Sequence, residues 1–321
     1  MNLSLILRDF SDDLAQVEQG LERALDASQP LLREAAQHLL KAGGKRLRPL
    51  LVLVAGRFGR YDLARLKPIA VALELIHLAT LVHDDVIDDA ATRRGRPTVR
   101  AKWGDAIAMY TGDYIFARSL QVAAEVDNPR IHQVLSQAVV DMCIGEMVQI
   151  RDFFNVQLCL RDYLRRIKRK TALLMAVSAQ LGAMAAEAPA HVVRALREYG
   201  HNMGMAFQIT DDILDYTGTE DVLGKPVGSD LKQGIVTLPA LYALATSPRA
   251  GVLREWIATQ RVADHLSEAL SIVRESGGIA FAKDLAVRYL NRALDALRAL
   301  PDVPARRTLE AVARFVGNRS Y

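Results

Sequence analysis

A long apolar stretch that ends in acidic residues constrains the fold of this chain more than any other feature. Residues 73–83 are mostly apolar, and Asp84, Asp85, Asp88 and Asp89 follow directly. A helix that is apolar on every side belongs in a protein interior, so we expect these carboxylates to emerge from its end into an enclosed space. Helical residues three and four apart are neighbours, which places Asp84, Asp85 and Asp88 on one face, with Cβ atoms roughly 5 to 6 Å apart.

Carboxylates held this close together repel one another, and a hard divalent cation removes the repulsion. Mg²⁺ typically takes one or two carboxylates, several waters and the oxygens of a substrate phosphate. The alternative is a solvated helix end, because acidic runs on surface helices are common. One acidic cluster alone does not decide between the two.

The same acidic pattern occurs a second time, 127 residues further along the chain (211 minus 84). Residues 204–210 form another apolar approach, and Asp211, Asp212 and Asp215 follow it. This offset is far too long for a solenoid repeat. We therefore predict two buried helices that point their acidic ends at each other across a shared cavity and hold metal ions between them.

Composition indicates a globular protein without a nucleic-acid surface. Apolar residues make up 50% of the 321 residues and charged residues 24%, and 41 basic against 37 acidic residues give a net charge of +4. This balance, without a basic run that includes aromatics, argues against nucleic-acid binding. Cys143 and Cys159 are isolated, with no CxxC pattern and no histidine at zinc spacing. We expect no apolar segment of the length of a membrane span, no signal peptide and a cytoplasmic location.

Apolar residues recur at helical spacing along the rest of the chain, and no alternating pattern is long enough to build a sheet. We predict an all-α fold, as one domain over residues 1–321, because no Pro/Ser-rich linker divides the chain. The predicted helices cover residues 14–41, 50–58, 66–89, 107–126, 131–153, 160–186 and 189–216, followed by helical, amphipathic segments over residues 238–321.

Basic residues accompany the acidic clusters. Lys45 and Arg48 lie three residues apart in the segment 43–49, with Pro49 in a position to start the next helix, and Arg93 and Arg94 follow the first acidic cluster. A basic loop is often merely solvated, and arginines beside aspartates can simply neutralise them. Arginine forks also suit phosphate oxygens, and a metal ion with arginine is a common way to hold a diphosphate.

A glycine-rich segment follows the second acidic cluster and predicts a flexible cover over the site. It is not a Walker A loop, because five residues rather than four separate Gly218 from Gly224, and Pro226 stands where Ser or Thr is required.

Two facing acidic clusters, several basic residues and a cavity walled by apolar helices predict a substrate with a polyanionic head and a hydrocarbon body. A diphosphate that carries divalent ions is a good leaving group, and a carbocation can then form in a pocket free of water. No serine, cysteine or histidine constellation indicates a covalent nucleophile.

The order of these motifs resembles that of the trans-isoprenyl diphosphate synthases, the polyprenyl synthetase family. The resemblance spans nearly the whole chain, and its motifs are residues 43–49, 83–88 with 93–95, 170–171 and 207–215. More narrowly, residues 71–77, 110–120 and 317–321 are similar to component II, the catalytic subunit of two-component heptaprenyl diphosphate synthases. The resemblance implies the helical isoprenoid synthase fold around a deep central cavity.

The resemblance also implies a role for each motif residue. Direct ligands of Mg²⁺, about three ions with substrate bound, would be Asp84, Asp88 and Asp211. The supporting catalytic carboxylates would be Asp85, Asp212 and Asp215. Contacts to the allylic diphosphate would come from Arg93, Lys170, Thr171, Gln208 and Lys225. Isopentenyl diphosphate would be held by Lys45, Arg48, His77 and Arg94. The allylic substrate ionises, the isopentenyl double bond attacks its cation, and loss of a proton leaves a trans product one unit longer.

Two positions bear on variation within the family. Many relatives carry a lysine where this chain has Ile235, so that phosphate contact is missing or is replaced by Lys232. Ala79 and Thr80 lie five and four residues before Asp84, where short-chain relatives have an aromatic plug. Small side chains there predict an open tunnel and a product longer than farnesyl, although Ala79 can equally reflect tight helix packing.

The expected product is heptaprenyl diphosphate, made from farnesyl diphosphate for a menaquinone side chain, by a dimer that includes a small, unrelated component I subunit and releases its product near a membrane. The alternatives are a homodimer that makes geranylgeranyl, hexaprenyl or octaprenyl diphosphate, and a class I terpene cyclase. The second acidic cluster and the segment 43–49 favour chain elongation over cyclisation. An inactive regulatory partner is expected to lack aspartates in at least one cluster, whereas this chain keeps both. A helical scaffold protein would explain neither acidic cluster.

Overall fold

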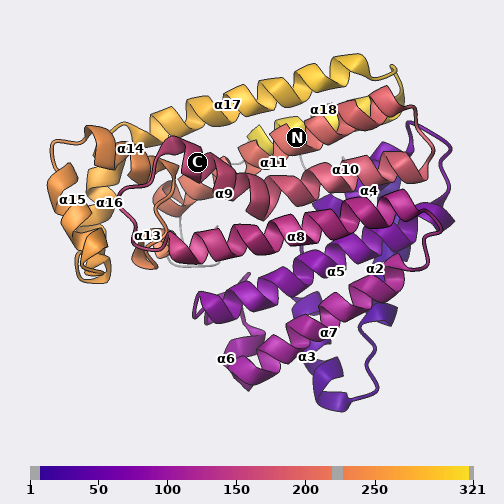
Figure 1. The fold of residues 1–321 in the computed structure, drawn as a ribbon, viewed down its shortest axis with the longest axis horizontal. Helices are drawn as coiled ribbons and strands as arrows, with labels where there is room; N and C mark the ends of the chain where they lie inside the picture. Colours follow the sequence, from indigo (N-terminus) through magenta and orange to yellow (C-terminus); the bar gives the residue numbers. More distant parts are fainter. Residues whose placement is uncertain (1–7, 219–226, 318–321) are drawn as a thin grey trace. The chain divides into compact units, whose positions relative to one another are not determined.

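The computed structural model describes residues 8–218 and 227–317, and in this part the chain is helical apart from one short hairpin (Figure 1). The predicted all-α class is confirmed. The chain falls into two compact units, the first of residues 1–137, 174–200 and 296–312, and the second of residues 138–173, 201–295 and 313–321. The predicted single domain stays a prediction.

The first unit is built around one long helix, α5 (Leu63–Ile87), which packs against α2, α4 and α7. Its other elements are η1 (Arg8–Phe10), α2 (Ser11–Ala24), α3 (Pro30–Lys41), α4 (Leu47–Gly56), β1 (Thr92–Arg93), β2 (Arg96–Pro97), α6 (Val99–Trp103), α7 (Asp105–Ala123), nearly all of α10 (Leu173–Ala185), η4 (Leu297–Ala299), most of α18 (Pro304–Gly317) and the first parts of α8 (Pro129–Arg151) and α11 (Ala190–Thr217).

Helix α5 is a core helix. It is apolar on all sides and is buried along most of its length from Leu66 to Val82, as the sequence predicts. It also has the length and mean hydropathy of a membrane span, so the expectation that no segment reaches that length was wrong. Since 67% of its most apolar 18-residue window is buried inside the protein, the apolar surface of α5 is explained by the core.

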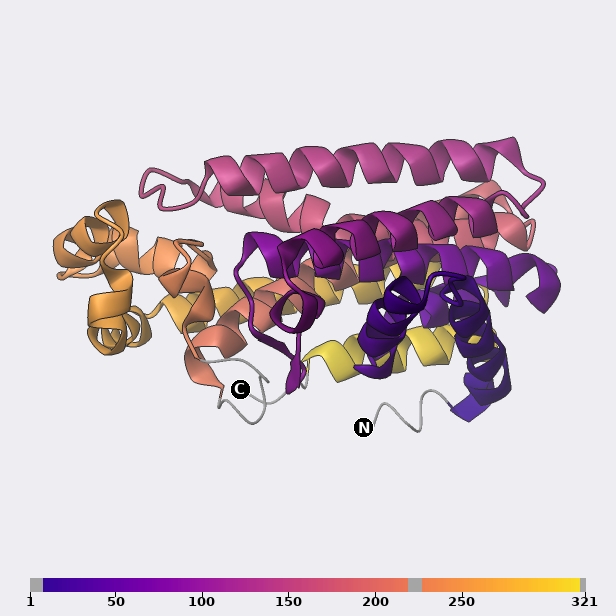
Figure 2. The same cartoon turned by 90° about the horizontal axis from the view of Figure 1, so that it is seen from below.

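The second unit contains the remainders of α8 and α11, together with α9 (Leu160–Ile167), the π-helical turn η2 (Lys168–Ala172), α13 (Ser229–Lys232), α14 (Leu238–Thr246), α15 (Ala250–Ala258), η3 (Val262–His265), α16 (Leu266–Glu275) and nearly all of α17 (Gly278–Ala296). The short helices α14, α15 and α16, coloured orange, gather in one group (Figures 1 and 2). Their core includes Tyr216 at the end of α11, Leu253, Ile257 and Val273.

Several predicted helix boundaries were wrong, each for a local reason. The predicted helix 14–41 is two helices, because Pro30 has no N–H to continue one helix and instead starts α3, with the Gln29 side chain accepting a hydrogen bond from the Leu32 N–H. The predicted helix 160–186 is interrupted by η2. Helix α4 begins at Leu47 rather than at Pro49, which lies in the first turn, where its missing N–H costs no helical bond.

The first acidic cluster lies at the end of α5 rather than wholly within it. The helix ends at Ile87, and Asp88 is its C-cap, with the backbone N–H of Asp88 donating to the Asp84 carbonyl at 2.8 Å. Asp89 then adopts a left-handed conformation with φ of 51°, which turns the chain out of the helix. The predicted alignment of Asp84 and Asp88 along one face therefore holds only at the last turn.

The hairpin β1–β2 follows directly. Its strands pair antiparallel, and the two residues between them, Arg94 and Gly95, both have positive φ, of 54° and 72°. Two successive left-handed residues form the turn that suits a two-residue hairpin, and glycine is favoured at the second of them. The hairpin brings Arg93 back toward the end of α5.

Candidate functional site

In the first unit, the end of α5 carries one fully buried and two half-buried carboxylates. Asp85 is 1% exposed, whereas Asp84 and Asp88 are half-buried. The Nε and Nη2 atoms of Arg93 both lie 2.7 Å from Oδ1 of Asp85. Burial raises the pKa of Asp85, and the charge of Arg93 opposes that rise. Arg93 thus neutralises Asp85. This is one of the two alternatives that the sequence left open for the basic turn, namely that its arginines neutralise the aspartates.

A second group of charges in the first unit surrounds Glu74, an acidic residue inside the apolar part of α5. Glu74 is 3% exposed and accepts a hydrogen bond from Nη1 of Arg46 at 3.1 Å. The Nε and Nη2 atoms of Arg46 also donate to the two carboxylate oxygens of Glu18 in α2, at 2.9 and 2.8 Å. Neither Arg46 nor Glu74 was predicted from the sequence. A lone glutamate within an apolar helix was the signal that a buried cation had to lie beside it.

Next to this group lies a buried cation with an unused hydrogen-bond donor. Arg48 is 9% exposed, and its Nε has no hydrogen-bond partner in the part of the chain that the structure describes. Burial, helped by the nearby charge of Arg94 and opposed by that of Glu74, lowers the pKa of Arg48 to about 10. Arg48 therefore stays charged at neutral pH, and its unpaired N–H is costly unless a ligand accepts it.

His77 lies on α5 among four guanidinium groups. Burial lowers its pKa well below the ordinary value, and so do the charges of Arg48, Arg94, Arg93 and Arg46, in that order. The imidazole is therefore neutral at neutral pH. So many cations near one neutral ring form a strongly positive site, which favours a ligand with several negative charges. The predicted residues Arg48, His77 and Arg94 are thus brought together, and Lys45 is exposed in the same segment.

In the second unit, a chain of hydrogen bonds connects the predicted residues. The Thr171 hydroxyl donates to the Gln208 side-chain oxygen at 2.5 Å, and Nε2 of Gln208 donates to Asp212 at 2.8 Å. The other carboxylate oxygen of Asp212 accepts from the Tyr163 hydroxyl at 2.7 Å. Burial raises the pKa of Asp212 to about 7, and the charge of Asp230 contributes to the rise. Tyr163 was not predicted, because a single tyrosine on an amphipathic helix gives no sequence signal of a functional role.

The third aspartate of this cluster, Asp215, fixes the start of α13. Asp215 is fully buried and accepts from the Ser229 hydroxyl at 3.1 Å and from the Asp230 backbone N–H at 3.2 Å. Its backbone carbonyl accepts from the Gly228 N–H at 2.8 Å. Asp215 therefore secures the chain where it returns after residues 219–226. Lys225 lies in that segment, outside the described residues.

The π-helical turn η2 positions Lys170 and Thr171. Such turns insert an extra residue into a helix and are frequent at functional sites. The Lys170 ammonium lies 3.6 Å from the carboxylate of Glu146 on α8. The neighbouring Arg169 fits because Gly145 has no side chain, since a Cβ there would lie 2.7 Å from the Cβ of Arg169. Lys170 and Thr171 are therefore brought to the same unit as Gln208 and Asp212.

Ile235 and Lys232 lie close to Asp230 in the chain, after the start of α13. Their positions do not show which residue replaces the lysine that many relatives carry at the position of Ile235. Ile235 is half-buried, and its backbone N–H donates to the Asp230 carbonyl at 2.8 Å. Lys232 is exposed at the end of α13. Its replacement of the missing phosphate contact stays a prediction.

Burial separates the six aspartates of the two clusters into two sets. Asp85, Asp212 and Asp215 are buried and bonded to the protein, whereas Asp84, Asp88 and Asp211 are half-buried. Within the described residues, no three His, Cys, Asp or Glu side chains are grouped closely enough to hold a metal ion by themselves. This donor set fits Mg²⁺, which binds few protein carboxylates and takes the rest of its ligands from water and substrate phosphates.

The helical fold, with two aspartate clusters at helix ends and basic side chains beside them, defines the class of helical enzymes that act on diphosphate substrates. The family model for polyprenyl synthetase matches residues 29–273, and the chain belongs to this family. Heptaprenyl diphosphate synthase component 2 of Geobacillus stearothermophilus is 54% identical over 321 residues, which cover all of both chains.

Solved structures agree with this assignment. Heptaprenyl diphosphate synthase from Staphylococcus aureus has a TM-score of 0.91 at 39% identity, covering 100% of this chain and 99% of that one. A polyprenyl synthase from Caulobacter crescentus, complexed with calcium and isoprenyl diphosphate, has a TM-score of 0.95 at 34% identity, covering 100% of this chain and 98% of that one. The predicted isoprenoid synthase fold is confirmed, and the chain is a trans-prenyltransferase of the kind that makes long-chain products.

Proposed function

We propose that the chain condenses isopentenyl diphosphate with farnesyl diphosphate to make all-trans heptaprenyl diphosphate, the precursor of a menaquinone side chain, in the cytoplasm. The observation that carries the diphosphate assignment is Arg48, a buried cation whose Nε has no partner among the described residues, beside a neutral His77 among four arginines. The relatives named as heptaprenyl diphosphate synthases support the chain length.

Isopentenyl diphosphate would be held in the first unit. Its phosphate oxygens would accept from the Nε of Arg48 and from Arg94 and Lys45, with the neutral imidazole of His77 as a further donor. Arginine presents several N–H groups in a rigid plane, which suits phosphate oxygens. The ion pairs that bind Arg46 to Glu18 and Glu74 hold the end of the segment 43–46 in place.

The allylic diphosphate would be held chiefly from the second unit, by Lys170, Thr171, Gln208 and Lys225, and from the first unit by Arg93. Glu146 orients the Lys170 ammonium. The hydrogen bonds from Thr171 through Gln208 to Asp212 fix the direction in which the Gln208 amide points. These residues position the diphosphate so that its bond to the allylic carbon is the one that breaks.

Asp84, Asp88 and Asp211 would bind Mg²⁺, about three ions in all, together with the phosphate oxygens. When bound, Mg²⁺ neutralises the diphosphate charge and makes it a better leaving group. The buried aspartates support these ligands. Asp85 holds Arg93, Asp212 holds Gln208, and Asp215 holds the start of α13.

The reaction needs no residue that forms a covalent bond to the substrate. The allylic carbon–oxygen bond breaks and its electron pair leaves with the diphosphate, and the isopentenyl double bond then supplies the pair for the new carbon–carbon bond. A proton lost from the neighbouring carbon restores a trans double bond, and the departing diphosphate is the base we propose. The role of the protein is to position both substrates and to exclude water from the cation.

We also propose that a small, unrelated subunit completes the enzyme, as the name component 2 of the relatives supports. In the first unit, α7 exposes Met109, Tyr110 and Leu120, of which Tyr110 is 72% exposed. In the second unit, α8 exposes Val140, Ile144 and Met147 at helical spacing, with Met147 68% exposed. Large apolar side chains gathered on one helix face are typical of a surface that binds another protein.

The direct test is to incubate the purified chain, with a candidate component 1 subunit, with radiolabelled isopentenyl diphosphate, farnesyl diphosphate and Mg²⁺, and to size the products. We expect an all-trans product of seven units that disappears when EDTA removes the metal. A cyclised hydrocarbon formed from farnesyl diphosphate alone would contradict the proposal and favour a terpene cyclase. A product of another length would retain the reaction and overturn the heptaprenyl assignment.

A further inference from the structure

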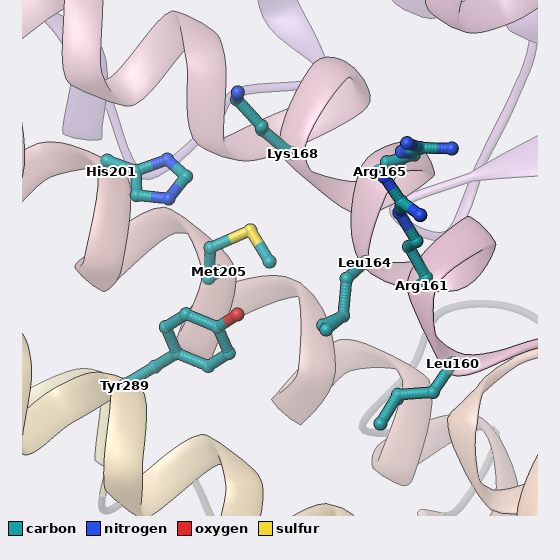
Figure 3. A pocket seen from close by; sticks show the side chains of 8 residues that line it. All are labelled: Leu160, Arg161, Leu164, Arg165, Lys168, His201, Met205 and Tyr289. Carbon is teal, nitrogen blue, oxygen red and sulfur yellow. The ribbon is translucent and has the colours of Figure 1, made fainter.

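A groove on the second unit lies outside the residues that the proposed reaction uses. It has a volume of about 490 Å³ and is formed by α9, η2, α11 and α17 (Figure 3). The residues that line it are Leu160, Arg161, Leu164, Arg165, Lys168, His201, Met205 and Tyr289. This volume lies in the range of clefts that bind small organic ligands.

The groove has an apolar floor. Figure 3 shows Leu164, Met205 and Tyr289 around its centre, with Leu160 at one end. Met205 is 2% exposed and Tyr289 9%, so these two belong to the packed interior, whereas Leu160 is 38% exposed. Leu164 is half-buried, so a hydrocarbon chain laid along the groove would remove the exposed surface of Leu160 and Leu164 from water, above Met205 and Tyr289.

Basic side chains follow the α9 edge of the groove. Arg161, Arg165 and Lys168 are spaced four and three residues apart and share one helix face, and all three are exposed. The guanidinium of Arg292 adds a fourth cation, 5.4 Å from the centre of the Tyr289 ring.

Little negative charge faces these cations within residues 8–218 and 227–317. Among these described residues, none of those that line the groove is Asp or Glu. Arg165 lies 3.9 Å from Asp162, but both side chains are more than a third exposed, and such pairs contribute little. Arg161 and Lys168 make no ion pair within the described part of the chain. The groove therefore combines an apolar floor with an uncompensated positive edge.

We propose that this groove binds an anionic phospholipid at a membrane surface. The lipid phosphate lies against Arg161, Arg165 and Lys168, and one acyl chain lies over Leu164, Met205 and Tyr289. Clusters of basic residues on an amphipathic helix attract the anionic lipids of a bilayer. An acidic protein segment would satisfy the cations but would not need an apolar floor, so the lipid fits both features. The proposal does not depend on the chain length of the product.

The test is sedimentation of the full chain with vesicles of phosphatidylcholine, with and without phosphatidylglycerol. We expect binding only to the phosphatidylglycerol vesicles, weakened by salt. The affinity of the variant R161E/K168E for these vesicles should be lower by about tenfold or more. The matched control is R194E/R197E, which makes the same charge change at two exposed residues of α11 in the other unit. It should bind nearly as well as the unmodified chain.

The apolar floor is tested separately with Leu160→Ser, which changes an exposed side chain and leaves the core intact. We expect weaker binding to the same vesicles, by severalfold, and unchanged circular dichroism. The single variant Arg161→Glu, on α9, should also bind the vesicles more weakly, while its prenyl transfer in vesicle-free buffer should equal that of the unmodified chain. Failure of the proposed reaction and failure of lipid binding are thereby distinguished. No binding to phosphatidylglycerol vesicles, or equal loss in R161E/K168E and R194E/R197E, would overturn the proposal.

Discussion

Two residues of the proposed isopentenyl diphosphate site, Arg48 and His77, lower the stability of the folded protein in the absence of ligand. Arg48 is buried, and its Nε is unpaired in the part of the chain that the structure describes, while His77 is kept neutral by burial and by the charges around it. Unsatisfied donors and neutralised histidines are common where a ligand completes the set of interactions. Both features lead to measurable predictions.

Replacing Arg48 with lysine keeps the charge but removes the Nε donor and the planar fork. We expect the KM for isopentenyl diphosphate to rise by about tenfold or more, because a hydrogen bond to a charged group is worth about 1.5 to 3 kcal/mol. The KM for farnesyl diphosphate should change little. Steady-state kinetics with each substrate varied in turn will check this, with Arg57→Lys, at a partly exposed residue paired with Asp13, as the control. An unchanged KM for isopentenyl diphosphate would exclude Arg48 from its binding.

His77 gives the unfolding free energy a definite dependence on pH. Its folded pKa is lowered, so below the ordinary value of about 6.5 the unfolded chain binds a proton that the folded chain does not. Stability is fully present above that pH and falls as the pH drops below it, by up to about 1.4 kcal/mol per pH unit for this one group. Urea unfolding at neutral and mildly acidic pH should show a smaller acid loss for His77→Gln than for the unmodified chain. Equal losses in the two proteins would show that His77 is not the group responsible.

At the scale of elements, each unit uses a departure from regular structure to place its charged groups. The first uses the left-handed residue Asp89, which turns the chain at the end of α5 so that Arg93 reaches Asp85. The second uses the π turn η2, which carries Lys170 and Thr171. Strained or irregular backbone is frequent at functional sites because it aims side chains that a regular helix would direct elsewhere.

Helix α5 carries the prediction about product length. Ala79 is 2% exposed, so a Phe at this position either fills the proposed tunnel or overpacks the core. If the tunnel is there, Ala79→Phe should shorten the product while Tm stays nearly unchanged. If Ala79 only packs tightly, overpacking should cost about 1 to 3 kcal/mol of stability. Product sizing by reversed-phase chromatography and thermal unfolding on the same sample separate the two, and a full-length product would contradict the tunnel.

The sequence was sufficient for the regular parts of the fold and for the motif residues, and insufficient where a contact comes from far along the chain. The helix around residues 66–89 and the burial of its apolar face follow from composition alone. The pairing of Arg46 with both Glu18 and Glu74 does not, because it joins three separate helices or turns. Nor does Tyr163 beside Asp212, or the extra residue of η2, since neither alters the helical spacing of apolar residues.

At the scale of the whole molecule, the second subunit that we propose would cover exposed apolar residues on α7 and α8. Activity should therefore depend on a second subunit. We expect the isolated chain to elongate farnesyl diphosphate weakly and a purified component 1 subunit to raise the rate at least about tenfold.

The matched variants for this test are Met147→Glu and Gln133→Glu, which add the same charge at two exposed residues of α8. Met147→Glu places the charge within the apolar face and should abolish the stimulation, whereas Gln133→Glu, at a residue that is already polar, should retain most of it. Rates measured while the second subunit is titrated will check this. Full long-chain synthesis without a partner would refute the two-component assignment and leave the family unchanged.

The two ion pairs of Arg46, with Glu18 and with Glu74, have a practical consequence for variants of this polypeptide that are shortened or fused at the N-terminal end. Removing α2 would take away Glu18, free one side of the guanidinium and loosen the turn that carries Lys45 and leads into the first turn of α4, where Arg48 lies. Truncations made for convenience at that end would then register as poor turnover, although no residue that touches substrate had been altered.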